Sequence, residues 1–251
     1  MQLFEGDCLE IMKQIPDTSV DMVLCDLPYG TTACKWDSVL PFVALWGAYN
    51  RLTKPNGAMV FTASQPFSSA LVMSNPNQFR YEWIWDKQIP SGMTYARFQP
   101  MRQHEAVLVF SKEKCVYNPQ MTKRDNPIKS GGQKRLNSES TTLDKYKVDG
   151  FQRTYDYKNP VTIVSFMKVR RGSVHPTQKP VALMEYLIRT YTNEGAVVLD
   201  SCMGSGTTGV ACANTNRDFI GIEQDPKYFQ IAKSRIYEAL AEFSFFGEKI
   251  N

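Results

Sequence analysis

The chain has 251 residues, of which 43% are hydrophobic and 22% are charged, and its formal net charge is +4. This composition is typical of an ordinary soluble globular protein. The length is sufficient for one large domain or for one domain that carries an insertion. No apolar run approaches the roughly 20 residues that a membrane crossing needs, and the N-terminus lacks the basic and apolar regions of a secretory signal. The six cysteines form no Cys-x-x-Cys pair and there are two histidines, so we expect reduced thiols and no metal site.

Short apolar strands alternate with helical patterns over the first 110 residues. We expect strands at 1–5, 20–25, 58–62, 81–85 and 106–110, and helices at 8–15, 41–52 and 67–73. After an interruption the pattern resumes, with helices at 180–192, 206–213 and 226–240 and strands at 197–199 and 219–222. The run from Val20 to Cys25 is almost continuously apolar, which is typical of a strand buried on both faces. The alternation predicts an α/β fold with a parallel sheet.

The alternation stops between about Lys114 and Asn159. Residues 112–171 contain 14 Lys or Arg and 6 Asp or Glu, whereas the rest of the chain is mildly acidic. This excess of positive charge is either a solvated face or a polyanion-binding module attached to a catalytic core. Residues 122–135 have no apolar period and are rich in Gly, Ser, Asn and Lys, so we expect them to be mobile or ordered only against a partner.

A glycine-rich turn follows the strand expected at 197–199. Residues 197–209 read VVLDSCMGSGTTG, and the next strand ends at Glu223, 19 positions after Gly204. Such a turn lets the backbone approach a ligand closely, and the carboxylate can reach a ribose diol. A P-loop is excluded because no Gly-Lys-Ser/Thr follows. The glycines leave NAD and S-adenosylmethionine equally open. Asp200, directly before the turn, favours the latter, because an amino group needs a carboxylate and a pyrophosphate does not.

The tetrapeptide Asp26-Leu27-Pro28-Tyr29 directly follows the buried strand at 20–25. Its side chains therefore lie at the carboxyl end of a strand, where open α/β sheets bind their ligands. Pro28 keeps Leu27 extended. Taken alone, these residues are better described as an Asp-Pro turn that ends a strand, with Tyr29 packed as a cover.

In combination with the glycine turn and Glu223, the tetrapeptide resembles the catalytic motif of the DNA amino-methyltransferases that act on adenine N6 or cytosine N4. Further similarities are the Gly-Asp element at 6–7, the segments 19–23 and 104–112, and the hexapeptide HPTQKP at 175–180. The tetrapeptide precedes the cofactor turn, with the basic segment between them, as in the β group of this family. The resemblance implies a circularly permuted Rossmann-like methyltransferase fold, a mostly parallel seven-stranded sheet with an antiparallel edge hairpin.

The resemblance also implies a domain organisation, a cofactor and its binding residues. Residues 1–112 and 172–242 would form the catalytic and cofactor-binding domain, and 113–171 an inserted target-recognition segment. The cofactor would be S-adenosyl-L-methionine, with S-adenosylhomocysteine as product. Its adenine would lie by Asp7 and Cys8, its methionine end by Thr177, Gln178 and Lys179, and its ribose by Glu223. The remaining expected contacts come from the turn and the following strand end: Asp200, Ser201, Met203, Gly204, Ser205, Gly206, Thr207 and Gln224.

For catalysis, the resemblance implies that Asp26 and the carbonyl of Leu27 accept the two N–H groups of the target amine, with Pro28 shaping the turn. Tyr29 would stack on the target base after the base has flipped out of the duplex. Most of the family has proline where this chain has Leu27, and we expect reduced preorganisation at most. Asp rather than Ser at position 26 favours adenine N6 over cytosine N4. Cys25 does not follow a proline, so a cysteine nucleophile is not expected.

Double-stranded DNA is the expected partner, and the resemblance also suggests a homodimer and a cognate restriction endonuclease, in the cytoplasm of a bacterium or encoded by a phage. Phosphates would be neutralised by Lys123, Arg124, Lys129, Lys134, Arg135 and Arg153, with Arg97 and Arg102 as alternative contacts. The aromatic residues Tyr146, Phe151, Tyr155 and Tyr157 can stack or wedge.

Three alternatives stay open. One is a different acceptor, which can be cytosine N4, RNA or a protein glutamine, and another is a non-catalytic DNA-binding subunit that keeps the fold. The third concerns His175, which is either structural or, as a less favoured interpretation, a metal ligand or general base.

Overall fold

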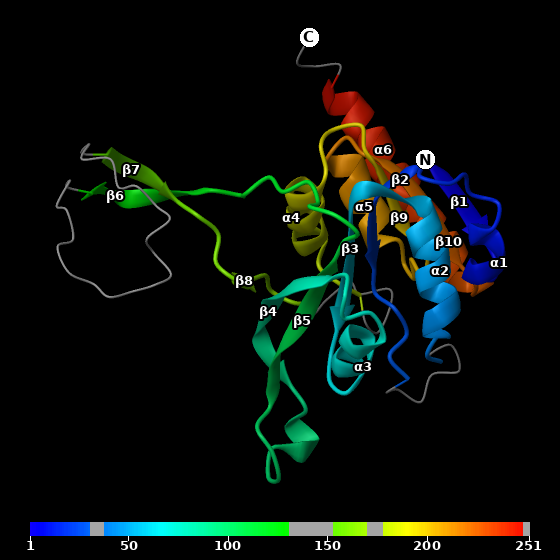
Figure 1. The fold of residues 1–251 in the computed structure, drawn as a ribbon, viewed down its shortest axis with the longest axis horizontal. Coiled ribbons are helices and arrows are strands. Elements are labelled where there is room, and N and C mark those ends of the chain that lie inside the picture. Colours follow the sequence, from blue (N-terminus) through cyan, green and yellow to red (C-terminus); the bar gives the residue numbers. More distant parts are fainter. Residues whose placement is uncertain (31–37, 131–152, 170–177, 248–251) are drawn as a thin grey trace. The chain divides into compact units, whose positions relative to one another are not determined.

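The computed structural model describes residues 1–30, 38–130, 153–169 and 178–247 (Figure 1). They form two compact units: Met1–Asn118 with Thr162–Asn251, and Pro119–Val161. Residues 113–118 and 162–169, which we expected in the basic insert, therefore belong to the larger unit. Among the helices in the described ranges, none combines the length and the apolarity that a membrane crossing requires.

The larger unit is built on one mixed sheet. Its strands, in spatial order, are β1 (Gln2–Glu5), β10 (Asp218–Glu223), β9 (Val197–Asp200), β2 (Val20–Cys25), β3 (Thr53–Ala63), β5 (Arg102–Phe110), β4 (Phe79–Ser91) and β8 (Ile163–Ser165). All neighbours pair in parallel except the two pairs that involve β5, which forms a hairpin with β4. The expected mostly parallel sheet with an antiparallel hairpin is confirmed. The short strand β8 is additional to the seven strands that we expected, since three residues carry too little periodicity to be recognised.

Helices cover both faces of this sheet (Figure 1). One layer consists of α4 (Val181–Tyr191), α5 (Thr207–Asn214) and α6 (Pro226–Gly247), and the other of α1 (Cys8–Met12), α2 (Phe42–Leu52) and α3 (Phe67–Ser74). Along β2, Met22 and Leu24 pack in the core cluster of the first layer, and Val23 and Cys25 in that of the second. The continuous apolar run of β2 is thus explained by burial on both faces.

The strand order places β2 directly beside β9, with Met22 opposite Val198 and Val23 opposite Leu199. From β2 the N-terminal part of the chain continues to β3, whereas from β9 the C-terminal part continues to β10 on the other side. Ligands of open α/β sheets bind outside the carboxyl ends of the strands at such a reversal. The tetrapeptide after β2 and the glycine turn after β9 therefore meet at one edge of the sheet.

Gly206 allows α5 to begin close against α6. Its φ is +77°, and a Cβ at this position would lie 2.8 Å from the Cβ and 2.9 Å from the Cα of Ala232. Any other residue would combine a strained backbone with a steric clash. Gly206 therefore lets the glycine turn pack closely against α6.

The smaller unit contains a two-stranded antiparallel sheet of β6 (Thr122–Ser130) and β7 (Arg153–Lys158). Residues 122–130, which belong to the stretch that we expected to be mobile or ordered only against a partner, form the strand β6. The side chains of Ile128, Tyr155 and Tyr157 are about half exposed, so a ribbon without a buried face gives no apolar alternation to recognise. Its register shifts between Lys123 and Ile128, a stretch that contains Pro127.

The hairpin strands β4 and β5 are longer than the segments 81–85 and 106–110 that we expected. Their additional residues are exposed or only partly buried, apart from the buried Lys87, and the short 3-10 helix η1 (Met93–Tyr95) lies between the two strands. The helix α6 is also longer than expected, since it continues to Gly247 and not only to residue 240. The helix α1 is shorter, since it ends at Met12 and not at residue 15.

Candidate functional site

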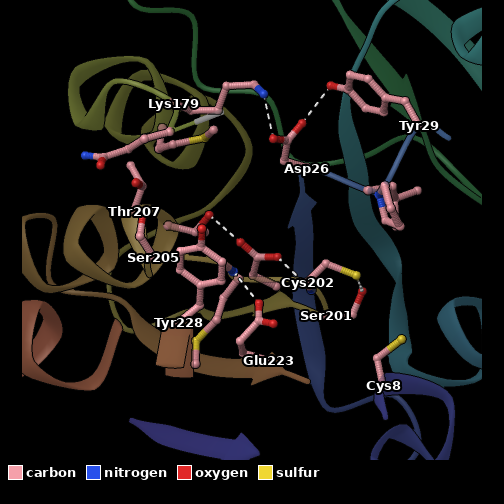
Figure 2. A pocket seen from close by; sticks show the side chains of 18 of the residues that line it. Cys8, Asp26, Tyr29, Lys179, Ser201, Cys202, Ser205, Thr207, Glu223 and Tyr228 are labelled. Carbon is pink, nitrogen blue, oxygen red and sulfur yellow. Dashed lines mark hydrogen bonds and ion pairs between the residues drawn. The ribbon is translucent and has the colours of Figure 1, made fainter. Parts of the chain in front are cut away.

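A cavity of about 630 Å³ opens at the carboxyl ends of β2, β9 and β10 (Figure 2). This volume is typical of a small-molecule site. The sequence-predicted residues that line it are Asp7, Cys8, Asp26, Leu27, Pro28, Tyr29, Gln178, Lys179, Asp200, Ser201, Met203, Gly204, Ser205, Thr207, Glu223 and Gln224. Gly206 does not line the cavity. Thr177 and His175 lie outside the described residues.

At one end of the cavity, hydrogen bonds hold the carboxylate of Asp26 from both sides. Its Oδ1 accepts from the Tyr29 hydroxyl at 2.6 Å and from the Thr62 hydroxyl. Its Oδ2 accepts from Lys179 Nζ at 2.5 Å (Figure 2). Burial, together with the negative charges of Asp26 and Glu105, raises the pKa of Tyr29 well above its ordinary value, so the phenol stays protonated and donates. The orientation of Asp26 is thereby defined.

The backbone and ring of the tetrapeptide are anchored by packing. The side chain of Leu27 is only 3% exposed and belongs to the core cluster on the α1–α3 face. The ring of Tyr29 stacks on Phe67, with centroids 5.0 Å apart and an angle of 24° between the planes. Burial of Leu27 therefore provides rigidity at the position where the resembling family has proline.

At the other end of the cavity, Glu223, which is the last residue of β10, links this strand to the glycine turn. Its Oε2 accepts the Gly204 N–H and its Oε1 the Asp225 N–H, each at 2.8 Å. Burial raises the pKa of Glu223, and the backbone donors partly oppose this effect. The half-buried carboxylate is an acceptor-only group on the cavity wall, with lone pairs beyond the two that these bonds use.

Asp200 supports the turn from inside. Its Oδ2 accepts from the Thr208 hydroxyl at 2.6 Å and its Oδ1 from the Cys202 N–H at 3.1 Å. The side chain is almost completely buried, and burial raises its pKa to about 6. Asp200 thus ties the first turn of α5 to Cys202, two residues after the end of β9.

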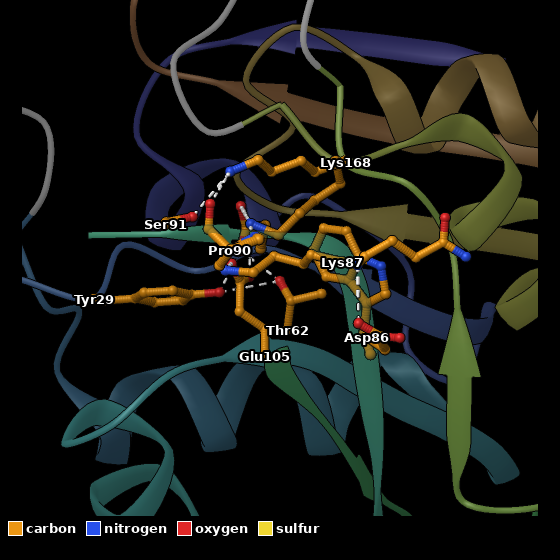
Figure 3. Close-up of polar contacts among 12 residues, drawn as sticks. Tyr29, Thr62, Asp86, Lys87, Pro90, Ser91, Glu105 and Lys168 are labelled. Atoms are coloured by element: carbon orange, nitrogen blue, oxygen red, sulfur yellow. Dashed lines mark hydrogen bonds and ion pairs between the residues drawn. The ribbon is translucent and has the colours of Figure 1, made fainter. Parts of the chain in front are cut away.

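The sequence patterns did not point to three residues at this charged end, which are Thr62 and the cavity-lining Lys87 and Glu105. Thr62 donates to Asp26, as described above. Lys87 of β4 and Glu105 of β5 (Figure 3) form an ion pair of 3.1 Å. Glu105 Oε2 lies 3.6 Å from Lys179 Nζ. The only available signal was that Lys87 and Glu105 lie next to the expected strands at 81–85 and 106–110. A charged residue in such a position is also compatible with a solvated strand end.

The basic residues predicted to contact DNA lie in both units. Arg97 and Arg102 are exposed at the tip of the β4–β5 hairpin. Lys123, Arg124 and Lys129 lie on β6, where Arg124 donates to the carbonyl of Tyr157 at 3.2 Å. Arg153 is the first residue of β7. Lys134, Arg135, Tyr146 and Phe151 lie outside the described residues. Within the described part of the chain, no three His, Cys, Asp or Glu side chains are grouped as metal ligands would be.

Residues 20–234 match the model of a known family, N6_N4_Mtase, described as DNA methylase. The chain belongs to this family. This DNA methylase is 25% identical to the Type II methyltransferase M2.MboI of Moraxella bovis over 262 aligned residues. The alignment covers 94% of this chain and 87% of the relative. It is 26% identical to the Type II methyltransferase M.HpaI of Haemophilus parainfluenzae, covering 99% and 78% of the two chains.

Two solved structures share the fold of this DNA methylase. The M1.HpyAVI–SAM complex superimposes with a TM-score of 0.62 at 30% identity, covering 93% of this chain and 98% of the other. The cytosine-N4-specific PvuII DNA methyltransferase superimposes with a TM-score of 0.64 at 16% identity, covering 96% and 91%. The second likeness concerns the fold alone.

Proposed function

We propose that this DNA methylase transfers a methyl group from S-adenosylmethionine to N6 of adenine in a specific duplex sequence. The observation that carries the proposal is that one cavity joins the held carboxylate of Asp26 to the turn-bound carboxylate of Glu223. M1.HpyAVI, 30% identical to this chain, forms a complex with SAM, which supports the same cofactor here.

The residues of the glycine-turn end fit this cofactor. Glu223 offers carboxylate oxygens to a ribose diol, which presents hydroxyl donors. Gly204 adds no side chain at the adjacent wall, so a ligand can approach the backbone closely. Cys8 lies after β1, beside this end, and Gln178 and Lys179 lie towards Asp26. When bound, the cofactor supplies an electrophilic methyl group on a sulfonium.

The tetrapeptide end is suited to hold the acceptor amine. The lone pair of an exocyclic amine is delocalised into the ring, which makes the nitrogen a poor nucleophile. Asp26 accepts one N–H and the carbonyl of Leu27 the other, which favours tetrahedral geometry and stabilises the positive charge that develops on nitrogen. Tyr29 and Thr62 fix the orientation of the Asp26 carboxylate before the base arrives. The base reaches this cavity only after it has flipped out of the duplex.

The choice of adenine rests on Asp at position 26 and on the resemblance described above. Cytosine N4 is the alternative, because its amine presents the same two donors and the same delocalised lone pair. Duplex DNA would be bound by Arg97 and Arg102 and by the basic residues of β6, through phosphate contacts that depend on salt. A cognate restriction endonuclease is a proposed partner, because the relatives are named Type II methyltransferases.

Expression in a host without DNA methylation, followed by sequencing of its DNA for modified bases, tests the base and the site together. We expect N6-methyladenine at one sequence, absent with Asp26→Asn and retained with the control Glu82→Gln, an exposed residue of β4. N4-methylcytosine would instead establish the alternative. If wild-type protein bound S-adenosylmethionine and DNA but left no mark, the proposed transferase activity would be wrong.

A further inference from the structure

Four charged side chains of alternating sign line the Asp26 end of the cavity. Asp26 Oδ2 lies 2.5 Å from Lys179 Nζ, Lys179 Nζ lies 3.6 Å from Glu105 Oε2, and Glu105 Oε1 lies 3.1 Å from Lys87 Nζ. The exposed fractions of these four side chains are 23%, 8%, 19% and 8%. The charges cancel as a set, so each ammonium depends on its carboxylate neighbours for compensation.

The two carboxylates of this set are used unequally. Both oxygens of Asp26 accept hydrogen bonds, three in all among the described residues. Glu105 Oε1 accepts from Lys87, whereas Glu105 Oε2 is buried and has no hydrogen-bond partner in the described part of the chain. A buried, unsatisfied charged oxygen is costly. It also provides a ready acceptor near the Lys179 ammonium.

We propose that Glu105 is a positioning residue that draws the Lys179 ammonium away from Asp26 Oδ2 when the target base enters. The inference rests on the proposed function, in which Asp26 accepts an N–H of the target amine. While Lys179 donates to Asp26, it competes for that oxygen, and its positive charge opposes the charge that develops on the amine nitrogen. A shift of about 1 Å turns the 3.6 Å contact with Glu105 into a hydrogen bond.

Lys87 makes this transfer possible by holding Glu105 in place. Lys87 and Glu105 lie on the paired strands β4 and β5, so the ion pair and the backbone pairing both hold the receiving carboxylate (Figure 3). Burial by itself lowers the pKa of Lys179, but Asp26 and Glu105 outweigh it and the pKa is raised. Lys179 therefore remains an ammonium, whichever carboxylate it contacts.

A double-mutant cycle on Glu105 and Lys179 tests the inference with full-length protein, labelled S-adenosylmethionine and genomic DNA from a methylation-free host. Glu105→Gln keeps the size of the side chain and an acceptor for Lys87 but loses the charge that receives Lys179. We expect its kcat to fall by about tenfold or more, since Lys179 stays on Asp26. In a Lys179→Met background no ammonium competes, so the same Glu105→Gln change should alter kcat by less than about twofold.

The controls separate this positioning role from a structural role. Calorimetry should show unchanged S-adenosylmethionine affinity for Glu105→Gln, and thermal unfolding should show that all variants are folded. Glu82→Gln, on the exposed side of the same hairpin, should behave as wild type. An equal loss from Glu105→Gln in both backgrounds, or no loss in either, overturns the inference while the proposed function stands. A wild-type protein that transfers no methyl group overturns both.

Discussion

The backbone N–H of Gly204 donates to the Oε2 atom of Glu223 at 2.8 Å, which ties the turn after β9 to the end of β10. One carboxylate thereby shapes the turn and also faces the cavity in which we place the cofactor ribose. The two roles predict that Glu223 affects cofactor binding far more than the stability of the sheet.

Replacement of Glu223 by alanine should weaken S-adenosylmethionine binding about tenfold to hundredfold, because a ribose diol loses a charged acceptor. Isothermal titration calorimetry measures this directly. Asp218→Asn, at the opposite end of β10 and largely exposed, is the matched control and should leave the affinity unchanged. Wild-type affinity in Glu223→Ala would contradict the assignment of Glu223 to the cofactor.

Tyr29→Phe separates the hydroxyl of this residue from its ring. The variant keeps the stacking on Phe67 but loses the 2.6 Å hydrogen bond to Asp26. We expect kcat to fall by about tenfold, the equivalent of one charge-assisted hydrogen bond, since Thr62 and Lys179 still hold Asp26. Tyr29→Ala should lose at least tenfold more. Equal rates for the two variants in a methyl-transfer assay would show that the ring contributes nothing.

Gly206→Ala should be strongly destabilising. Its φ of +77° disfavours any side chain, and the new Cβ would meet Ala232 at 2.8 Å. Gly195 has a similar φ of +75°, but a Cβ there would have no described atom within 4 Å, so Gly195→Ala isolates the backbone effect. We expect losses of about 1 kcal/mol for Gly195→Ala and about 3 kcal/mol or more for Gly206→Ala in urea unfolding. Similar losses for both would argue against a tight α5–α6 contact.

The buried carboxyl of Asp200 predicts a pH-dependent contribution to stability. Since burial raises its pKa from 3.8 to about 6, the folded protein binds this proton more tightly than the unfolded chain, and stability decreases as pH rises from about 4 to 6. Asp200→Asn lacks this titration. The free energy of unfolding of wild type relative to the variant should therefore fall by up to about 3 kcal/mol between pH 4 and pH 7 in cofactor-free protein. A pH-independent difference would mean that Asp200 ionises normally.

Most of the helices and strands of the larger unit could be predicted from the sequence, because their apolar residues repeat with the period of a buried face. The helix Val181–Tyr191 is an example, whereas the strand Val20–Cys25 was recognisable by its nearly continuous apolar run. The exposed ribbon of β6 and β7 was missed because it buries neither face, and β8 because it is only three residues long. The tetrapeptide and the glycine turn were recognisable as separate motifs, since strand ends and glycine turns leave local signals.

By itself, the sequence determined the α/β class and the two motifs, which depend on residues close together in the chain. It also determined the family that the motifs resemble, which depends on their order along the chain. Only the tertiary structure decided that β2 lies beside β9, which brings Asp26 and Glu223 to one cavity. It also decided that Lys87, Glu105, Lys179 and Asp26 form one series of ion pairs. Those contacts join residues 18 to 153 positions apart, and their spacing is set by strand pairing and register, for which no local pattern exists.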